Sequence, residues 1–494
     1  MSEAKQASKE AGIYAYSRIV ASVFILLTLA LGARLYSSPE FEYIGALLLL
    51  YESAVALGSL GLADAVFYYI GKQPADAPLV VRQTSFLLLC VAGPVVAIVC
   101  LFGLTMHGKI PLAPALPWLA ATILIELPTQ PAVNQLLAVR RARLASGLYV
   151  LFASFRPIAV LLPALTGIDI TYVPIVLAIT GTTRLVAHLT IMKRIFPLRS
   201  GETRKQWLVP STLWSIVGFA FPAGVAILGG KLNPQIDKYV VHWVRGTHDF
   251  NLYTAAAWEL PLITLIPYAI GAVMQARYVR LYEGGQKREL RELWLNTVRK
   301  TGMLVLPLTA MMIALANEAV VVVSGERYAG AAILFQIFTL TMLQRVTAYG
   351  PILQSIGETR SLLVTNSMLI IANLALSYPF TKVFGFPGAA IATVSATIPP
   401  LLFTLWRISI KFHCKMSEVM PYRHYFATLG LSSALAVGLF CLRPYLGHSA
   451  GVRLGLGAAI YVVTFTVVAR VVGLIKREDL MYLRDWLSLR MLRH

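Results

Sequence analysis

The segment KLNPQIDKYV, which begins at Lys231, places ionisable side chains inside an apolar stretch. If the segment is a continuous helix, Lys231, Gln235 and Lys238 follow an i, i+4, i+7 spacing and lie on one stripe, with Asp237 on an adjoining one. Such a face is polar and net cationic, and it suits an anionic ligand. The alternative interpretation is a helix end that unwinds at Pro234 and leaves interfacial charges.

Further charges lie inside apolar stretches. Eight of them are cations, namely Arg18, Arg34, Arg156, Arg184, Lys231, Lys238, Arg345 and Arg470. Five are acids, namely Glu52, Asp64, Glu126, Asp237 and Glu259. A cation near the bilayer centre costs roughly 2.5 to 3.5 kcal/mol, so it faces a protein interior, a water-filled path or an anionic ligand. Because the cations outnumber the acids, pairing alone does not absorb the positive charge.

The arginines differ in the depth at which they lie. Arg18 is about seven residues into the first span, roughly 10 Å deep, which predicts a cavity-lining residue, although a long side chain can also snorkel to the interface. On depth alone, Arg34 and Arg470 lie near span ends and are expected to snorkel.

The deeper charges have two interpretations each. Arg156, Arg184 and Arg345 fall near the middle or inner half of their spans, so each one either pairs with a buried acid or faces a lumen. Glu52 and Glu126 lie near mid-span and are either structural partners for an arginine or relays for H⁺ or Na⁺.

These residues must be positioned by membrane-spanning helices. Charged residues make up 13% of the chain and hydrophobic residues 57%. Apolar runs of about 20 residues, the length that crosses a bilayer, recur from end to end. They predict an all-α polytopic membrane protein with about fourteen spans. The ranges are 11–36, 41–70, 83–105, 115–138, 145–166, 171–192, 212–241, 251–276, 301–323, 328–355, 362–381, 386–407, 426–446 and 452–475.

The distribution of Lys and Arg predicts the orientation. With the N-terminus inside, the inner segments carry 29 of these cations and the outer loops carry 6. This asymmetry predicts that both termini are cytoplasmic. Much of the net charge of +20 therefore favours anionic membrane lipids as partners and argues against nucleic acid.

Motifs for enzymatic chemistry are missing from the sequence. The four cysteines are scattered, and neither an HExxH motif nor a Gly-rich phosphate loop after a strand occurs. We therefore expect no metal, no cofactor and no enzyme.

A weak internal repeat suggests how the spans are grouped. A shift of 217 residues places Arg143 on Arg360, and each is followed by a helix, a short turn, a second helix and a basic end. Two parallel six-helix halves explain this pattern, which is common in transporters. The predicted divisions are an N-terminal lobe at 11–208, a C-terminal lobe at 209–412, two extra spans at 413–475 and a cytoplasmic tail at 476–494.

Two segments predicted to be cytoplasmic are amphipathic. In the first, Leu290, Trp294 and Val298 form an apolar stripe, and a similar stripe runs through 480–491. Both are expected to lie flat on the inner leaflet.

Several motifs resemble those of a known family. They are ARLYSSPEFEYIG at 33–45, GSLGLADAVFYYIGK at 58–72, QIDKYVV and YTAAAWELP within 235–261, GERYAGAA at 325–332, LQSIGETRSLL at 353–363 and FGFPGAAIAT at 384–393. Together they resemble the polysaccharide flippases of the multidrug, oligosaccharidyl-lipid and polysaccharide exporter superfamily. The resemblance runs from about residue 10 to residue 415.

The resemblance implies a mechanism and a site. It implies two six-helix lobes around a cationic central cavity in a bacterial inner membrane. This cavity would move an isoprenoid-pyrophosphate-linked oligosaccharide to the periplasmic leaflet by alternating access, for O-antigen or exopolysaccharide synthesis. Other polysaccharide-assembly proteins are possible partners. Spans one, two, seven and eight line the cavity in similar lipid-linked precursor flippases, which favours Arg18, Arg34, Glu52, Lys231, Asp237, Lys238 and Glu259.

Two other classes of protein stay open at this point. A multidrug exporter of the same superfamily is the first alternative, but for cationic drugs it is expected to bury more acids than cations. A membrane glycosyltransferase or polymerase is the second, but it usually needs a large extramembrane loop with paired acids.

Overall fold

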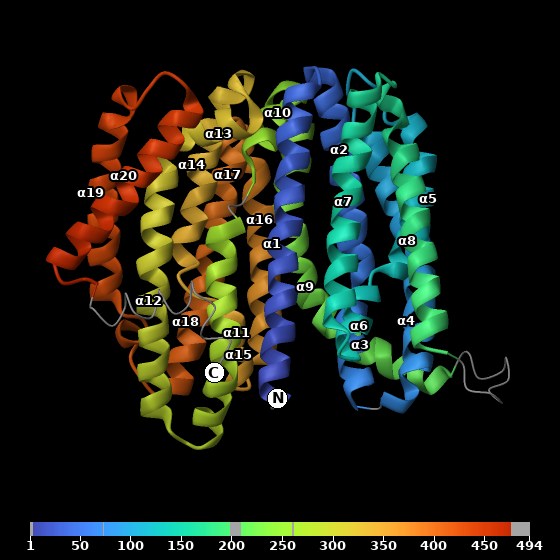
Figure 1. Cartoon of the computed structure of the whole chain (residues 1–494), viewed down its shortest axis with the longest axis horizontal. Coiled ribbons are helices and arrows are strands. Elements are labelled where there is room, and N and C mark those ends of the chain that lie inside the picture. The colour runs from blue at the N-terminus through green and yellow to red at the C-terminus, as the bar shows by residue number, and fades with distance from the viewer. Residues whose placement is uncertain (1–2, 73, 198–208, 259–260, 476–494) are drawn as a thin grey trace. The chain divides into compact units, whose positions relative to one another are not determined.

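The chain is helical throughout its described part. The computed structural model describes residues 3–72, 74–197, 209–258 and 261–475, and these contain α-helices and short 3-10 turns but no β-strand. The α-helices are α1 (Glu3–Leu35), α2 (Ser38–Ser59), α3 (Leu62–Lys72), α4 (Ala77–Thr105), α5 (Leu116–Glu126), α6 (Ala132–Ala138), α7 (Ala142–Thr166), α8 (Val173–Ile195), α9 (Pro210–Arg245), α10 (Thr247–Ala256), α11 (Pro261–Glu283), α12 (Lys287–Ala314), α13 (Ala316–Ser324), α14 (Ala332–Thr339), α15 (Tyr349–Ser355), α16 (Thr359–Phe384), α17 (Phe386–Ala396), α18 (Ile398–Phe412), α19 (Tyr422–Leu442) and α20 (Ala450–Val471) (Figure 1).

The length and apolarity of these helices confirm the predicted fold class. Within the described residues, ten helical segments are long and apolar enough to cross a membrane, and the bent pair α12 and α13 would be an eleventh. The protein is therefore an all-α polytopic membrane protein, whereas the number of fourteen spans stays a prediction. The amphipathic tail predicted at 480–491 lies outside the described residues.

Contacts within the chain define two compact units. Unit 1 extends to Asn251 and unit 2 begins at Leu252, so the division falls inside α10. Helix α9, which the sequence analysis counts with the C-terminal lobe, packs against α2, α3 and α4 and belongs to unit 1. The predicted boundary of the lobes at 208/209 stays a prediction.

A helix break shapes the centre of unit 1. The predicted span at 41–70 is interrupted, because α2 ends at Ser59 and α3 begins after Leu60 and Gly61, which both have positive φ. Helix α9 crosses this break at very short range. A Cβ atom on Gly224 would lie 2.2 Å from the carbonyl carbon and oxygen of Leu60, and one on Gly61 would lie 2.5 Å from the carbonyl oxygen of Ala220. Only glycines permit this contact between two backbones.

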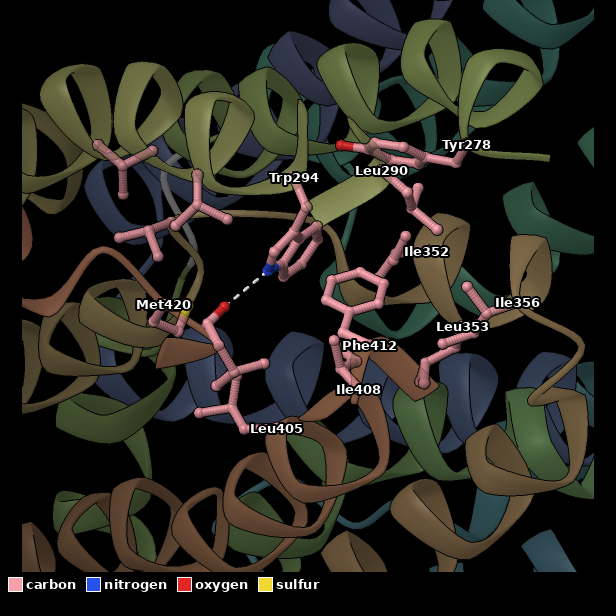
Figure 2. Close-up of a cluster of buried hydrophobic side chains, with 14 of the residues drawn as sticks. Tyr278, Leu290, Trp294, Ile352, Leu353, Ile356, Leu405, Ile408, Phe412 and Met420 are labelled. Atoms are coloured by element: carbon pink, nitrogen blue, oxygen red, sulfur yellow. Dashed lines mark hydrogen bonds between the residues drawn. The ribbon is translucent and has the colours of Figure 1, made fainter. Parts of the chain in front are cut away.

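A large apolar cluster stabilises one end of unit 2 (Figure 2). Leu290 and Trp294 of α12 are 0% exposed and pack with Ile408 of α18 and Ile352 of α15. The Trp294 indole N–H donates to the carbonyl oxygen of Val419 at 2.9 Å. The prediction that this stripe lies flat on the inner leaflet is therefore wrong. The stripe belongs to the first turns of the continuous helix α12, and the unit's own side chains cover it.

A bend separates α12 from α13 in unit 2. The two helices meet at an angle of 76°, so the predicted span at 301–323 is sharply bent. The predicted span at 328–355 is also interrupted, by the 3-10 turn Leu340–Gln344 and an irregular segment that follows it.

The hairpin of α19 and α20 packs beside this bend. Leu439 and Tyr461 of the hairpin join Met311 and Leu315 in one apolar cluster. A Cβ atom on Gly457 would lie 3.1 Å from the Leu315 side chain, which shows how closely α20 approaches. The C-terminal hairpin is thus part of the packing of unit 2.

One turn occurs in both units at the spacing of the predicted repeat. In unit 1, the backbone N–H of Arg141 donates to Leu136 O at 2.8 Å, and Arg140 has φ of 59°. In unit 2, the N–H of Glu358 donates to Leu353 O at 2.8 Å, and Gly357 has φ of 74°. These positions differ by 217 residues, so the same helix ending precedes α7 and α16. This local geometry supports the internal repeat.

Candidate functional site

Helix α9 presents its polar stripe to α2 within unit 1. The helix is continuous from Pro210 to Arg245 and passes through Pro234, so the alternative of an unwound end is wrong. Lys231 Nζ donates to Ser59 Oγ at 3.1 Å, and one turn later Gln235 Nε2 donates to Glu52 Oε2 at 2.9 Å. The predicted i, i+4 stripe therefore exists and lies against α2.

The Glu52 carboxylate lies at the centre of this contact. Its Oε1 atom accepts a hydrogen bond from Arg156 Nη1 of α7 at 2.7 Å, and its Oε2 atom accepts the bond from Gln235. Lys238 adds a favourable electrostatic interaction with the same carboxylate. The side chains of Arg156 and Glu52 are 25% and 28% exposed, so this ion pair is only partly shielded. Helices α2, α7 and α9 thus meet at one carboxylate.

A second ion pair lies deeper in the unit. Arg184 Nη1 of α8 is 3.4 Å from Glu126 Oε2 at the end of α5, and these side chains are 14% and 5% exposed. Gly181 of α8 leaves room for the carboxyl group, because a Cβ atom there would lie 3.2 Å from Glu126 Oε1. The sequence left two interpretations for Arg184, which were pairing with a buried acid or facing a lumen. In the structure Arg184 pairs with Glu126.

Tyr51 connects the two ion pairs. Its hydroxyl group donates to Glu126 Oε2, and the guanidinium of Arg156 lies over its ring at 5.0 Å from the centroid. The chain of contacts therefore runs from Arg184 through Glu126, Tyr51 and Arg156 to Glu52. Each charged group has a partner of opposite charge or an aromatic face, as a buried polar network requires.

The charge of this network is unbalanced. Arg184 and Glu126 neutralise each other in the buried pair. Arg156, Lys231 and Lys238 then outnumber Glu52 and Asp237, of which Asp237 is only 1% exposed. Among the side chains that the structure describes, the more exposed part of the cluster therefore contains more cations than acids.

The other predicted site residues have different positions. Arg18 is exposed on α1, and its side chain makes no ion pair among the described residues. Arg34 is exposed in the last turn of the same helix. Arg345 belongs to unit 2, directly after a 3-10 turn. Glu259 lies outside the described residues.

Sequence reasoning missed the uncharged members of the network. Tyr51, Ser59 and Gln235 supply a donor, an acceptor and an aromatic face, but only Gln235 was singled out by its spacing. The i, i+1 position of Tyr51 beside Glu52 is the signal that could have located it. No cluster of three or more potential metal-ligating side chains occurs within the residues that the structure covers.

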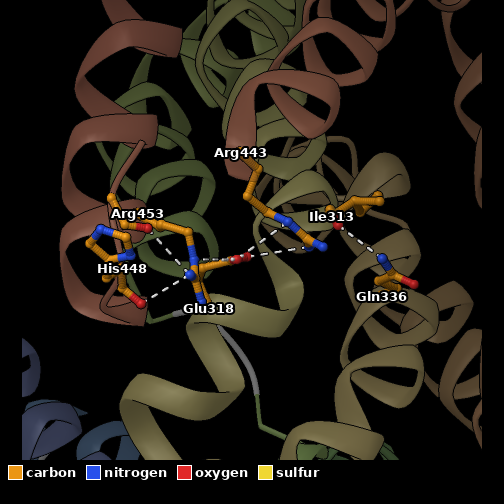
Figure 3. Close-up of polar contacts among 7 residues, drawn as sticks. Ile313, Glu318, Gln336, Arg443, His448 and Arg453 are labelled. Carbon is orange, nitrogen blue, oxygen red and sulfur yellow. Dashed lines mark hydrogen bonds and ion pairs between the residues drawn. The ribbon is translucent and has the colours of Figure 1, made fainter. Parts of the chain in front are cut away.

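Unit 2 contains two further carboxylate clusters that the sequence did not reveal. Glu318, which is 1% exposed in α13, lies 3.3 Å from Arg443 Nε and 3.2 Å from Arg453 Nε (Figure 3). Both arginines flank the turn between α19 and α20. In the second cluster, Glu358 binds Arg407 at 2.7 Å and Lys411 at 3.2 Å. These clusters hold helices together within unit 2.

The fold is shared with solved transporters of low sequence identity. The lipid II flippase MurJ in an inward closed conformation matches with a TM-score of 0.69 and 14% identity, over 94% of this chain and 99% of that one. An inward-facing multidrug resistance MATE family transporter of the MOP superfamily matches with a TM-score of 0.61 and 16% identity, over 79% and 95%. A MOP superfamily transporter from Pyrococcus furiosus, described as having a binding pocket of reverse polarity, matches with a TM-score of 0.56 and 15% identity, over 83% and 97%.

A family model identifies the chain more directly. No curated protein sequence matches it. However, the model for the polysaccharide biosynthesis protein family matches residues 31–333, which is more than half of the chain. This match includes α2, α5, α7, α8 and α9, the helices that carry the ion-pair network. The chain therefore belongs to the polysaccharide biosynthesis protein family, and its fold is that of the MOP superfamily of transporters and flippases.

Proposed function

We propose that this protein is a flippase that moves an isoprenoid-pyrophosphate-linked oligosaccharide from the cytoplasmic to the periplasmic leaflet. The observation that carries the proposal is the gathering of three cations, Arg156, Lys231 and Lys238, around α9 among the described side chains of unit 1. Membership of a polysaccharide biosynthesis family supports a glycan as cargo. The fold shared with a lipid II flippase supports movement of a lipid-linked molecule.

The chemistry of the cluster fits a pyrophosphate. A pyrophosphate carries several acceptor oxygens and more than one negative charge, so it binds best where two or three Lys or Arg side chains converge. Arg156 offers a planar guanidinium, and Lys231 and Lys238 offer flexible ammonium groups. Arg156 and Glu52 are partly exposed, which supports access of such a group to these donors. The isoprenoid tail stays in the bilayer.

Transport by alternating access completes the proposal. The proposal places the protein in a bacterial inner membrane. It has two lobes, and both termini are in the cytoplasm. Arg18 and Arg34 of α1 are further candidate contacts for the anionic headgroup, and Arg345 of unit 2 stays a candidate phosphate-binding residue. No chemical step on the glycan is needed, so the protein acts as a transporter and not as an enzyme.

Deletion of the gene that encodes this protein in its host tests the function. We expect one surface glycan to disappear and its lipid-linked precursor to accumulate in the cytoplasmic leaflet. Purified protein in lipid vesicles should then make a labelled lipid-linked oligosaccharide accessible to an added glycosidase. Unchanged surface glycans and no translocation in vesicles would contradict the proposal.

A multidrug exporter is the second candidate, because a MATE family transporter shares the fold. An exporter of cationic drugs would attract its substrates with acidic side chains. The described side chains of the unit 1 cluster include more cations than acids, which disfavours binding of cationic drugs. Expression in a drug-sensitive host separates the two functions. Drug resistance without any change in surface glycan would favour the exporter.

A further inference from the structure

The Glu52 carboxylate occupies the same donors that an anionic ligand needs. Its two oxygens accept from Arg156 Nη1 at 2.7 Å and from Gln235 Nε2 at 2.9 Å, and Lys238 interacts with it electrostatically. A phosphate oxygen pair has the same preference for a guanidinium, an amide N–H and an ammonium group. The donor set around Glu52 is therefore already arranged for an anion.

The ion pair can exchange its partner because it is only partly buried. The Arg156 and Glu52 side chains are 25% and 28% exposed, compared with 14% and 5% for Arg184 and Glu126. Because the Glu52 side chain is partly exposed, its released carboxylate would not be left as a fully buried unpaired charge, which is the costly outcome. The deeper pair cannot open in this way without burying an unpaired charge.

The rest of the network holds Arg156 in place during such an exchange. The Tyr51 ring packs under the Arg156 guanidinium, and the Tyr51 hydroxyl group is fixed by Glu126. Glu126 is itself fixed by Arg184. Arg156 therefore keeps its position when its carboxylate partner leaves.

We infer that Glu52 is a resident competitor for the anion site of unit 1. A phosphate-bearing ligand displaces the Glu52 carboxylate from Arg156, and Glu52 returns to Arg156 when the ligand leaves. The ligand class is a pyrophosphate or a related phosphate ester. This inference rests on the proposed function and adds how the same site releases its ligand.

Substitution of Glu52 by Gln tests this competition. Glu52→Gln keeps the shape of the side chain but removes the negative charge that competes for Arg156. We expect the full-length variant in phosphatidylcholine nanodiscs to bind inorganic pyrophosphate about three- to tenfold more tightly than the wild type, as measured by isothermal titration calorimetry. In vesicles, the same variant should translocate lipid-linked glycan more slowly, because release lacks the returning carboxylate.

Three further variants separate competition from a structural role. Glu52→Asp keeps the charge and should restore most of the wild-type affinity. Arg156→Gln should weaken pyrophosphate binding in both the wild-type and the Glu52→Gln background. The matched control is Glu292→Gln, which removes one carboxylate from the exposed Arg288–Glu292 pair of unit 2 and should leave the affinity unchanged. Circular dichroism and size-exclusion chromatography show whether each variant is folded.

The possible outcomes distinguish the inference from the proposed function. If folded Glu52→Gln binds pyrophosphate no more tightly than the wild type, the competitor role is wrong, while the flippase function stands. If neither protein binds pyrophosphate, both the competitor role and the phosphate site are wrong. If Glu52→Gln binds more tightly but the wild type translocates no lipid-linked glycan, the exchange stands and the proposed cargo is wrong. If phosphatidylglycerol added to the nanodiscs competes with pyrophosphate for binding, the exchange is supported. The anion that displaces Glu52 would then be a membrane phospholipid.

Discussion

The Tyr36 hydroxyl group lies between two backbone groups of α7 that an α-helix normally joins to each other. It donates to Val160 O at 2.6 Å and accepts from Ala164 N at 3.1 Å. Pro163, which lacks an N–H group, already weakens the helix at this point. The end of α1 is therefore hydrogen-bonded to a weak part of α7, the helix that carries Arg156.

Loss of this hydroxyl group should destabilise unit 1. We expect Tyr36→Phe to lower the free energy of unfolding by about 1 kcal/mol, because a buried donor and acceptor lose their partner. Chemical unfolding in detergent measures the change. Tyr445→Phe is the matched control, because Tyr445 is 83% exposed and its loss should have no effect. Equal stability of the Tyr36→Phe variant and the wild type would show that α7 closes its own hydrogen bonds.

Removal of positive charge from the proposed site should reduce export without unfolding the protein. We expect Lys231→Gln or Arg18→Gln to lower the rate of lipid-linked glycan export by about tenfold, the effect of losing about 1.4 kcal/mol of a charge-assisted contact. Export is measured from the surface glycan formed after induction. Lys382→Gln removes an exposed cation of α16 as a control. Wild-type export by the Lys231→Gln, Arg18→Gln double variant would refute the anionic site.

The close approach of α9 to the break between α2 and α3 should not tolerate a methyl group. We expect Gly224→Ala to destabilise the protein by about 1 to 3 kcal/mol, because the added carbon would lie 2.2 Å from the Leu60 backbone. Gly218→Ala on the same helix meets no atom within 4 Å and should be neutral or stabilising. Thermal unfolding of both variants measures the difference, and equal effects would contradict the contact.

The stability of unit 2 should depend on pH through Glu358. Burial by itself raises the pKa of the Glu358 carboxyl group, but hydrogen bonds from Arg407, Ser361 and Lys411 outweigh it and lower the pKa to about 2. Because the folded-state pKa lies below the unfolded value of about 4.3, the ionised group stabilises the fold above that pH, and the contribution is lost as the pH falls toward 2.

A variant without this carboxylate isolates the effect of pH. We expect Glu358→Gln to be less stable than the wild type at pH 7 by on the order of 2 kcal/mol. The difference in unfolding free energy should shrink as the pH falls through the range from about 4 to about 2. A difference that stays constant over this range would show that the carboxylate is not ionised in the fold.

Loss of both arginines around Glu318 should lower the stability of the protein more than loss of the Glu318 carboxylate. Arg443 and Arg453 are 25% and 24% exposed, whereas Glu318 is 1% exposed. Glu318→Gln leaves arginines that can reach water, but removal of both arginines leaves a buried, unpaired carboxylate. We therefore expect the double arginine variant to be destabilised by about 3 to 5 kcal/mol and Glu318→Gln by less.

Limited proteolysis of the turn between α19 and α20 measures this effect, because a detached hairpin exposes the turn to a protease. Arg470→Gln, an exposed cation in the last turn of α20, is the control. Equal cleavage of the double arginine variant and the wild type would contradict a role for the cluster in holding the hairpin.

Some of the site could be predicted from the sequence because it depends on local geometry. Helical spacing alone put Lys231 and Gln235 on one face of α9, and the structure confirms this face. Hydropathy and charge predicted the helical membrane class, because crossing hydrocarbon requires long runs of apolar residues. The 217-residue repeat also appeared in the sequence, and the same turn recurs at Arg140 and Gly357.

The partners of these residues depend on tertiary structure. Hydropathy could not show that the span after Phe41 breaks at Leu60, because the break is shaped by the close backbone of Gly224 in α9. The stripe of Leu290 and Trp294 was visible, but whether lipid or protein covers such a stripe depends on other helices.

The sequence by itself determined that the chain forms membrane-spanning helices and that their apolar stretches contain more cations than acids. Only the tertiary structure decided that Arg156 pairs with Glu52 and Arg184 with Glu126. The physical reason is that each pair joins helices that are far apart in the chain. An ion pair depends on a distance of a few ångströms between side chains, and sequence spacing sets that distance only within a single helix.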